Sequence, residues 1–193
     1  MNRPPQDVED VPFREAGQRR APAGVNAHFM MAHPAHVLAL GFGAGLSPKA
    51  PGTAGTLWAW ATFALLHPQL NDAQWATLIA LSIAVGWWAC TRTARAMRVM
   101  DPGSIVWDEV AAFLLVLWLI IPSGFWGQLA AFALFRFFDA AKPGPVAWAD
   151  QLFHGVDPSG DRYAWHKAGW GIMLDDLVAA FCTLLVMAAW RAW

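Results

Sequence analysis

The chain has 193 residues, of which 57% are hydrophobic and 14% are charged, so it carries fewer charges than the quarter or so that is usual for a soluble domain. Its formal net charge of −1 excludes the strongly basic character typical of proteins that bind nucleic acid. Cys90 and Cys182 lie in apolar runs without Cys or His partners at metal spacing, which excludes a zinc site or a disulfide framework. This composition predicts a single domain in contact with a membrane.

The N-terminal 27 residues are polar, contain prolines and mixed charges, and lack the apolar core of a signal peptide. This composition predicts a disordered tail over residues 1–27, followed by one folded domain over residues 28–193.

Five apolar runs follow in chain order, and each predicts a helix: 53–66, 73–91, 110–121, 129–138 and 177–190. Proline and glycine in 122–127 separate the third run from the fourth and predict a helical hairpin. Most runs are shorter than the ~20 residues needed to cross a hydrocarbon core, so tilted or partly embedded helices are equally compatible with them. The predicted fold is all-α: a compact, membrane-associated bundle of about five apolar helices, with short helices or loops on the cytoplasmic face.

The basic residues indicate which segments share a side of the membrane. The turns 67–74 and 122–128 contain neither Lys nor Arg, whereas almost all basic residues fall in the other connections, and only Arg191 disagrees. By the positive-inside rule, the N-terminus and the segments 41–56, 101–109 and 139–176 are predicted to be cytoplasmic.

Five acidic residues are predicted to meet on that cytoplasmic side. One pair precedes the third apolar run, another precedes the last run, and a single aspartate ends the fourth; they are Asp108, Glu109, Asp139, Asp175 and Asp176. Acids in a first helical turn can simply complement the helix dipole, and Lys142 could compensate Asp139 locally. As a cluster, however, they are hard oxygen ligands, which favour Mg²⁺, Mn²⁺ or Ca²⁺ over zinc.

A glycine-rich segment, 41–56, precedes the first apolar run. Its glycines, its hydroxyl groups and the following helix N-terminus predict a backbone nest for phosphate, with Gly43, Gly45, Ser47, Thr53 and Thr56 as contacts. Close packing of helices in a membrane explains the same glycines equally well. Lys49 can add charge to this nest or lie among lipid headgroups.

Several reaction mechanisms are excluded by inspection. Neither cysteine begins a Cys-x5-Arg loop, and no Asp-x-Asp-x-Thr motif occurs, so no protein nucleophile is evident. His36 and His154 lie in candidate segments, but a lone histidine is more often a structural hydrogen-bonding group.

The main alternative of another class is a small transporter or cation-binding channel with an acidic vestibule. Transporters commonly place functional charges near the bilayer midplane, which disagrees with the predicted distribution here.

Four sequence blocks together resemble the phosphatidylglycerophosphatase A family. The first is Gly41-Phe-Gly-Ala-Gly-Leu-Ser-Pro with Pro51-Gly-Thr-Ala-Gly55, and the second is Gly103-Ser-Ile-Val-Trp-Asp-Glu109. The third is Phe135-Arg-Phe-Phe-Asp-Ala-Ala-Lys-Pro143 with Pro145, and the fourth is His154-Gly155 continuing at Gly169-Trp-Gly-Ile-Met-Leu-Asp-Asp176.

This resemblance implies a Mg²⁺-dependent lipid phosphatase of the bacterial cytoplasmic membrane, which converts phosphatidylglycerophosphate into phosphatidylglycerol and inorganic phosphate. The same five acids are then the implied metal and catalytic residues. Lys142 and Arg136 are implied to lie near the phosphate, and Ser47 and Thr53 to help hold it. The chain departs from the family pattern in about thirteen extra residues at 156–168 and in a charged residue at Lys49.

Overall fold

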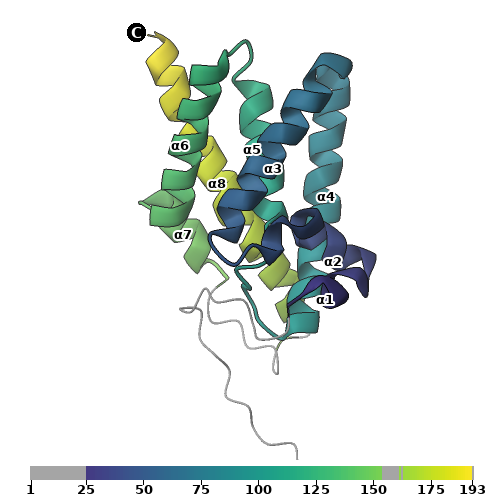
Figure 1. The fold of residues 1–193 in the computed structure, drawn as a ribbon. Helices are drawn as coiled ribbons and strands as arrows, with labels where there is room; N and C mark the ends of the chain where they lie inside the picture. The colour runs from purple at the N-terminus through teal and green to yellow at the C-terminus, as the bar shows by residue number, and fades with distance from the viewer. Residues whose placement is uncertain (1–24, 154–160, 162, 193) are drawn as a thin grey trace, which may run out of the picture.

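A computed structural model describes residues 25–153, 161 and 163–192 of the chain. Within this part the chain forms helices and connecting turns and contains no strand (Figure 1), which confirms the predicted all-α class. Most of the predicted N-terminal tail, residues 1–24, lies outside the described residues.

Each of the five apolar runs forms a helix, and the five are longer in most cases than predicted: α3 (Pro51–Leu66), α4 (Asp72–Met97), α5 (Trp107–Leu119), α6 (Phe125–Ala141) and α8 (Ala164–Ala192). Shorter elements complete the described chain: α1 (Ala27–Met31), α2 (Pro34–Ala39), α7 (Pro145–Gln151) and the 3-10 helices η1 (Gly41–Leu46) and η2 (His67–Gln69). The start of α4 is fixed by a capping box between Asn71 and Gln74.

The last helix departs most from the prediction. Helix α8 begins at Ala164, thirteen residues before the predicted start at 177, so Asp175 and Asp176 lie inside a helix and do not precede it. The expectation that this acidic pair opens the last helix was therefore wrong. Gly169, which precedes the predicted helix, lies within α8 and serves helix packing, because a Cβ atom there would collide with the hydroxyl group of Thr91 on α4.

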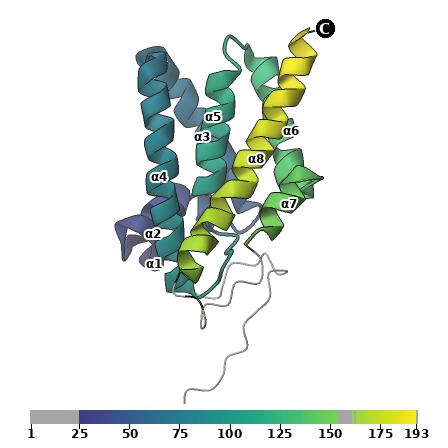
Figure 2. The ribbon, with the colours of Figure 1, turned by 180° about the vertical axis from the view of Figure 1, so that it is seen from behind.

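Helix α5 forms the centre of the bundle. It packs against α3, α4, α6 and α8, and in Figures 1 and 2 it lies between them. Most of its side chains are buried, including Phe113, whose ring lies 5.4 Å from that of Phe135 on α6. Because α8 crosses α5 and also packs on α4, α6 and α7, residues in the lower half of α8 can reach the start of α5.

The connections fall at two ends of the bundle, as the charge pattern predicts. The α3–α4 and α5–α6 turns lie together with the C-terminal end of α8 at the top of Figure 1. The glycine-rich segment, the α4–α5 connection and the short helices α1, α2 and α7 lie at the opposite end, which is called the loop end below. The structure thus gathers the predicted site segments at one end.

Two described helices, α4 and α8, are long and apolar enough to cross a membrane, judged by length and composition. Large apolar side chains are exposed on the outer surface of the bundle: Leu65, Leu81, Trp88, Trp126, Phe181, Leu185 and Trp190. Exposed apolar surface of this extent is typical of a protein that contacts lipid.

Candidate active site

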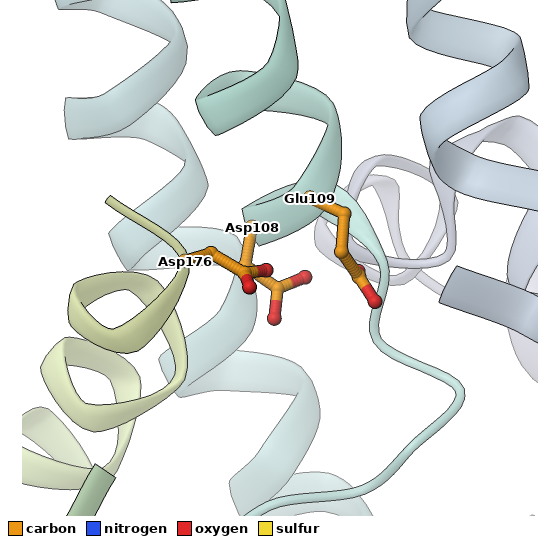
Figure 3. A group of neighbouring side chains, drawn as sticks. All are labelled: Asp108, Glu109 and Asp176. Atoms are coloured by element: carbon orange, nitrogen blue, oxygen red, sulfur yellow. The ribbon is translucent and has the colours of Figure 1, made fainter. Parts of the chain in front are cut away.

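Three of the predicted acidic residues converge at the loop end. Asp108 and Glu109 stand in the first turn of α5, and Asp176 projects from α8 (Figure 3). One carboxylate oxygen from each residue lies within 4.8 Å of those of the other two. We call Asp108, Glu109 and Asp176 the acidic triad.

The acidic triad is largely removed from water and only partly hydrogen-bonded. Glu109 and Asp176 are 9% and 2% exposed, and Asp108 is half-buried. Oδ1 of Asp108 and Oε2 of Glu109 are buried without a hydrogen-bond partner among the described residues. Buried unpaired carboxylate oxygens are costly, so the donor set fits a divalent cation, which would satisfy these atoms.

The same environment raises the pKa of both acids in α5. Burial, followed by the neighbouring charges of Glu109 and Asp176, raises the pKa of Asp108 well above its usual range. Burial likewise raises the pKa of Glu109, to about 7, although the guanidinium of Arg136 opposes the rise. A bound cation would favour the ionised forms of both carboxylates.

Asp139, in the last turn of α6, borders the acidic triad but has a cationic partner. Nη1 of Arg136 forms an ion pair with Oδ2 of Asp139 and lies 3.7 Å from Oε1 of Glu109. The same nitrogen donates to Oγ1 of Thr56 at 3.5 Å. Arg136 therefore balances the negative charge of Asp139 at this helix end. The interpretation from the sequence that Lys142 balances this charge was wrong.

Lys142 belongs to a second ion-pair group, with Asp150 on α7 and Asp175 on α8. Its Nζ lies 2.5 Å from Oδ2 of Asp175 and also donates to Oδ1 of Asp150. Burial alone would lower the pKa of Lys142, but the two carboxylates outweigh it and raise that pKa. Although Asp175 and Asp176 are adjacent in sequence, their side chains thus take part in different groups.

The glycine-rich segment brings the start of α3 to the acids. Within η1, Phe42 and Gly43 have positive φ angles of 53° and 112°, and a Cβ atom at Gly45 would collide with the carbonyl oxygen of Ser104. Ser47 donates its hydroxyl hydrogen to the carbonyl oxygen of Lys49 at 2.8 Å. Helix α3 then begins at Pro51, which places Thr53, half-buried, in its first turn.

Gly52 makes the closest approach to the acidic triad. A Cβ atom there would collide with Oε1 of Glu109 and would lie 3.1 Å from Nη1 of Arg136. The N-terminal turn of α3, with its free backbone N–H groups, therefore adjoins both a triad carboxylate and the nearest guanidinium. This geometry suits an anion held between a helix N-terminus and a cation-binding group.

Sequence reasoning missed Gly52 and Asp150 as members of this region, whereas Thr56, expected in the phosphate nest, accepts a hydrogen bond from Arg136. A glycine directly after the proline that opens a helix was an available signal for Gly52, whereas nothing in the local sequence marks Asp150. His36 is buried and its Nδ1 lies 3.0 Å from the carbonyl oxygen of Phe29, which confirms its structural role. His154 lies outside the described residues.

Comparison with known proteins identifies the family. Residues 37–191 match the family model described as Phosphatidylglycerophosphatase A. The chain is 40% identical to an Escherichia coli protein named Phosphatidylglycerophosphatase A over 77% of this chain and 78% of that protein. It is also 40% identical to a Haemophilus influenzae protein of the same name, over 83% of this chain and 91% of that one.

A more distant relative carries a different name. A Bacteroides thetaiotaomicron protein named Putative phosphatidylinositol-3-phosphatase is 33% identical over 80% of this chain and 92% of its own length. No solved structure matches the chain. The family model and the two relatives at 40% identity cover most of the chain, and the chain belongs to the phosphatidylglycerophosphatase A family.

Proposed function

We propose that this protein hydrolyses the terminal phosphomonoester of phosphatidylglycerophosphate, giving phosphatidylglycerol and inorganic phosphate. The observation that carries the proposal is the acidic triad, in which Oδ1 of Asp108 and Oε2 of Glu109 have no hydrogen-bond partner among the described residues, and which lies against the N-terminal turn of α3. Hydrolysis of a phosphate ester requires a site that binds the phosphate anion next to a cation that stabilises the charge on its oxygens. Family membership and the names of the two relatives at 40% identity support the choice of substrate.

Asp108, Glu109 and Asp176 would hold the Mg²⁺. Their oxygen-only donor set favours a hard cation. Such an ion, when bound, supplies charge stabilisation at phosphoryl oxygens and lowers the pKa of coordinated water.

The remaining site residues would bind and orient the phosphate. Arg136 presents a guanidinium at the border of the acidic triad, where Asp139 fixes its position. The N–H groups of Gly52 and Thr53 in the first turn of α3 would donate to phosphate oxygens, and Gly43, Gly45 and Ser47 would shape the loop that leads into this turn. Asp150 on α7 and Asp175 on α8 hold Lys142 at the loop end, next to the segment that would receive the phosphate.

In the proposed hydrolysis, a water oxygen forms a bond to phosphorus, the bond from phosphorus to the glycerol oxygen breaks, and that oxygen receives a proton. A carboxylate that is not engaged by the ion takes the proton from the water. An aspartyl-phosphate intermediate is the alternative. The two routes are separated by trapping of a labile acyl phosphate, together with hydrolysis in ¹⁸O-water.

The lipid tail places the reaction at a membrane. We propose that the protein lies in the bacterial cytoplasmic membrane with the loop end facing the cytoplasm. The basic residues on that side and the apolar helices α4 and α8 support this orientation. The diacylglycerol moiety would then contact the exposed apolar side chains of the bundle while the headgroup reaches the acidic triad.

The experiment is phosphate release from phosphatidylglycerophosphate in detergent micelles, with Mg²⁺ or with EDTA. We expect release only with the divalent cation. Phosphatidylinositol 3-phosphate is the comparison substrate, because the Bacteroides relative is named for that activity, and we expect slower release from it. A folded protein that releases no phosphate with any divalent cation, but conducts cations in liposomes, would instead be a transporter or channel.

A further inference from the structure

A second polar pocket lies on the outer surface of the loop end, between α4 and the start of α8. It has a volume of about 470 Å³, and its lining includes Trp88, Arg92 and Arg95 from α4 and Trp165 and His166 from α8. The acidic triad is not among its lining residues. From the charges and aromatic rings of this pocket, we infer that it binds the phosphodiester headgroup of an anionic phospholipid.

The positive charge of the pocket is available for a ligand. Arg92 and Arg95 are exposed, stand three residues apart and therefore lie on one face of α4. Neither guanidinium forms an ion pair or side-chain hydrogen bond with the residues that the structure describes. Two guanidinium groups on one face are well suited to the oxygens of a phosphate.

One carboxylate also lines the pocket, but a lysine neutralises it. Oδ2 of Asp161 lies 2.6 Å from Nζ of Lys167, and Oδ1 accepts the backbone N–H of Tyr163 at 2.8 Å. The pair Asp161–Lys167 contributes no net charge, so the two arginines leave the pocket positive. The N-terminal end of α8, which begins at Ala164, adds the positive pole of a long helix on the same side.

Close contacts between α4 and α8 fix the shape of the pocket. Nε1 of Trp87 donates to the carbonyl oxygen of His166 at 3.1 Å, and a Cβ atom at Gly169 would collide with Oγ1 of Thr91, so α4 and α8 are in close contact here. Thr91 is 8% exposed and lines the pocket, yet its Oγ1 has no hydrogen-bond partner in the described chain. This oxygen is buried against Gly169, so it belongs to the contact between the two helices and is not open to the pocket.

The aromatic side chains identify the ligand as a lipid and not a free anion. Trp88 and Trp165 line the pocket beside the arginines, and indole rings in membrane proteins are enriched at the level of the headgroups. The outer surface of α4 above them, with Leu81 and Val85 exposed, is apolar and would contact the acyl chains. A phosphate between the arginines and a chain along α4 would therefore occupy both surfaces together.

The test uses the full chain in neutral detergent micelles and measures retained lipid by native mass spectrometry. Phosphatidylserine is the probe, because it is an anionic phosphodiester and is neither substrate nor product of the proposed reaction; phosphatidylcholine is the neutral comparison. We expect phosphatidylserine to bind about tenfold more tightly, and Arg92→Gln or Arg95→Gln each to lower its affinity by about tenfold. Arg92→Lys, which keeps the charge, should retain part of the binding.

The matched control is Arg98→Gln, which removes the same charge from an exposed position just beyond α4 that does not line the pocket. Equal binding of the two lipids, or an equal loss in Arg98→Gln, would overturn the inference. Displacement of phosphatidylserine by inorganic phosphate at the same concentration would also overturn it, because the pocket would then be a free-anion site. Phosphate release by Arg92→Gln in the same micelles should equal that of the native chain, so this inference and the catalytic proposal can fail separately.

Discussion

Gly52, in the first turn of α3, lies directly against the carboxylate of Glu109, in the first turn of α5. Both helices therefore begin beside the acidic triad and direct the positive poles of their dipoles towards it. This arrangement stabilises ionised carboxylates and, in the proposed reaction, a bound phosphate. Any side chain at position 52 would have to displace Glu109 or Arg136.

Gly52→Ala is predicted to lower kcat/KM for phosphatidylglycerophosphate by about 30-fold or more, because the added methyl group moves Glu109 away from its position in the acidic triad. The backbone tolerates alanine here, since Gly52 is helical. Gly124→Ala is the control, because a Cβ atom at that helix start meets nothing within 4 Å. Steady-state phosphate release measures both variants, and a fully active Gly52→Ala enzyme would contradict the placement of Glu109.

Arg136→Gln is predicted to change phosphate turnover and metal affinity in opposite directions. Loss of the guanidinium removes a phosphate contact, which should lower kcat/KM by about 100-fold. It also removes the positive charge 3.7 Å from Glu109, so the Mg²⁺ concentration for half-maximal activity should fall. Titration of activity with Mg²⁺ measures both effects, and a higher Mg²⁺ requirement in the variant would show that Arg136 does not act as inferred.

Lys142→Gln is predicted to destabilise the protein, because it leaves two carboxylates, those of Asp150 and Asp175, facing a partly buried space. The Lys142 and Asp175 side chains are 16% and 12% exposed, and removal of one partner from a buried ion pair costs about 3 kcal/mol of unfolding free energy. Lys167→Gln is the control, because the Lys167 side chain is 47% exposed and the loss of its ion pair should leave the unfolding midpoint nearly unchanged. Unfolding in detergent micelles compares the two, and equal midpoints would refute the role of the buried pair.

The sequence predicted the arrangement of the helices better than their limits. The predicted limits of α4 and α8 were too short, because polar and charged residues occur near the ends of these helices. Arg92 and Arg95, for example, were assigned to a connection but lie within α4. Gly169 lies before the predicted start of the last helix, whereas it is part of α8 and contacts Thr91. In both cases tertiary packing extends a helix beyond the limit that local composition indicates.

For the candidate site, the sequence likewise predicted which residues lie together better than it predicted their individual partners. Basic residues in the connections predicted that Asp108, Glu109 and Asp176 share one end of the bundle, and the structure brings their oxygens within 4.8 Å. The partners of Arg136 and Lys142 could not be predicted, because they depend on how α6, α7 and α8 face one another. The roles assigned to the five acids remain predictions, and the two ion-pair groups separate Asp175 from the residues proposed to hold the ion.

The most direct test compares the Mg²⁺ requirement of phosphate release in the native chain, Asp176→Asn and Asp175→Asn. If the acidic triad holds the ion, Asp176→Asn should raise the Mg²⁺ concentration for half-maximal activity by about tenfold or more, or abolish release. Asp175→Asn should leave that concentration within about twofold of the native value, because Asp175 pairs with Lys142. The proposed metal site would be contradicted if Asp176→Asn needed the same Mg²⁺ concentration for half-maximal activity as the native chain, or if this concentration changed equally in both variants.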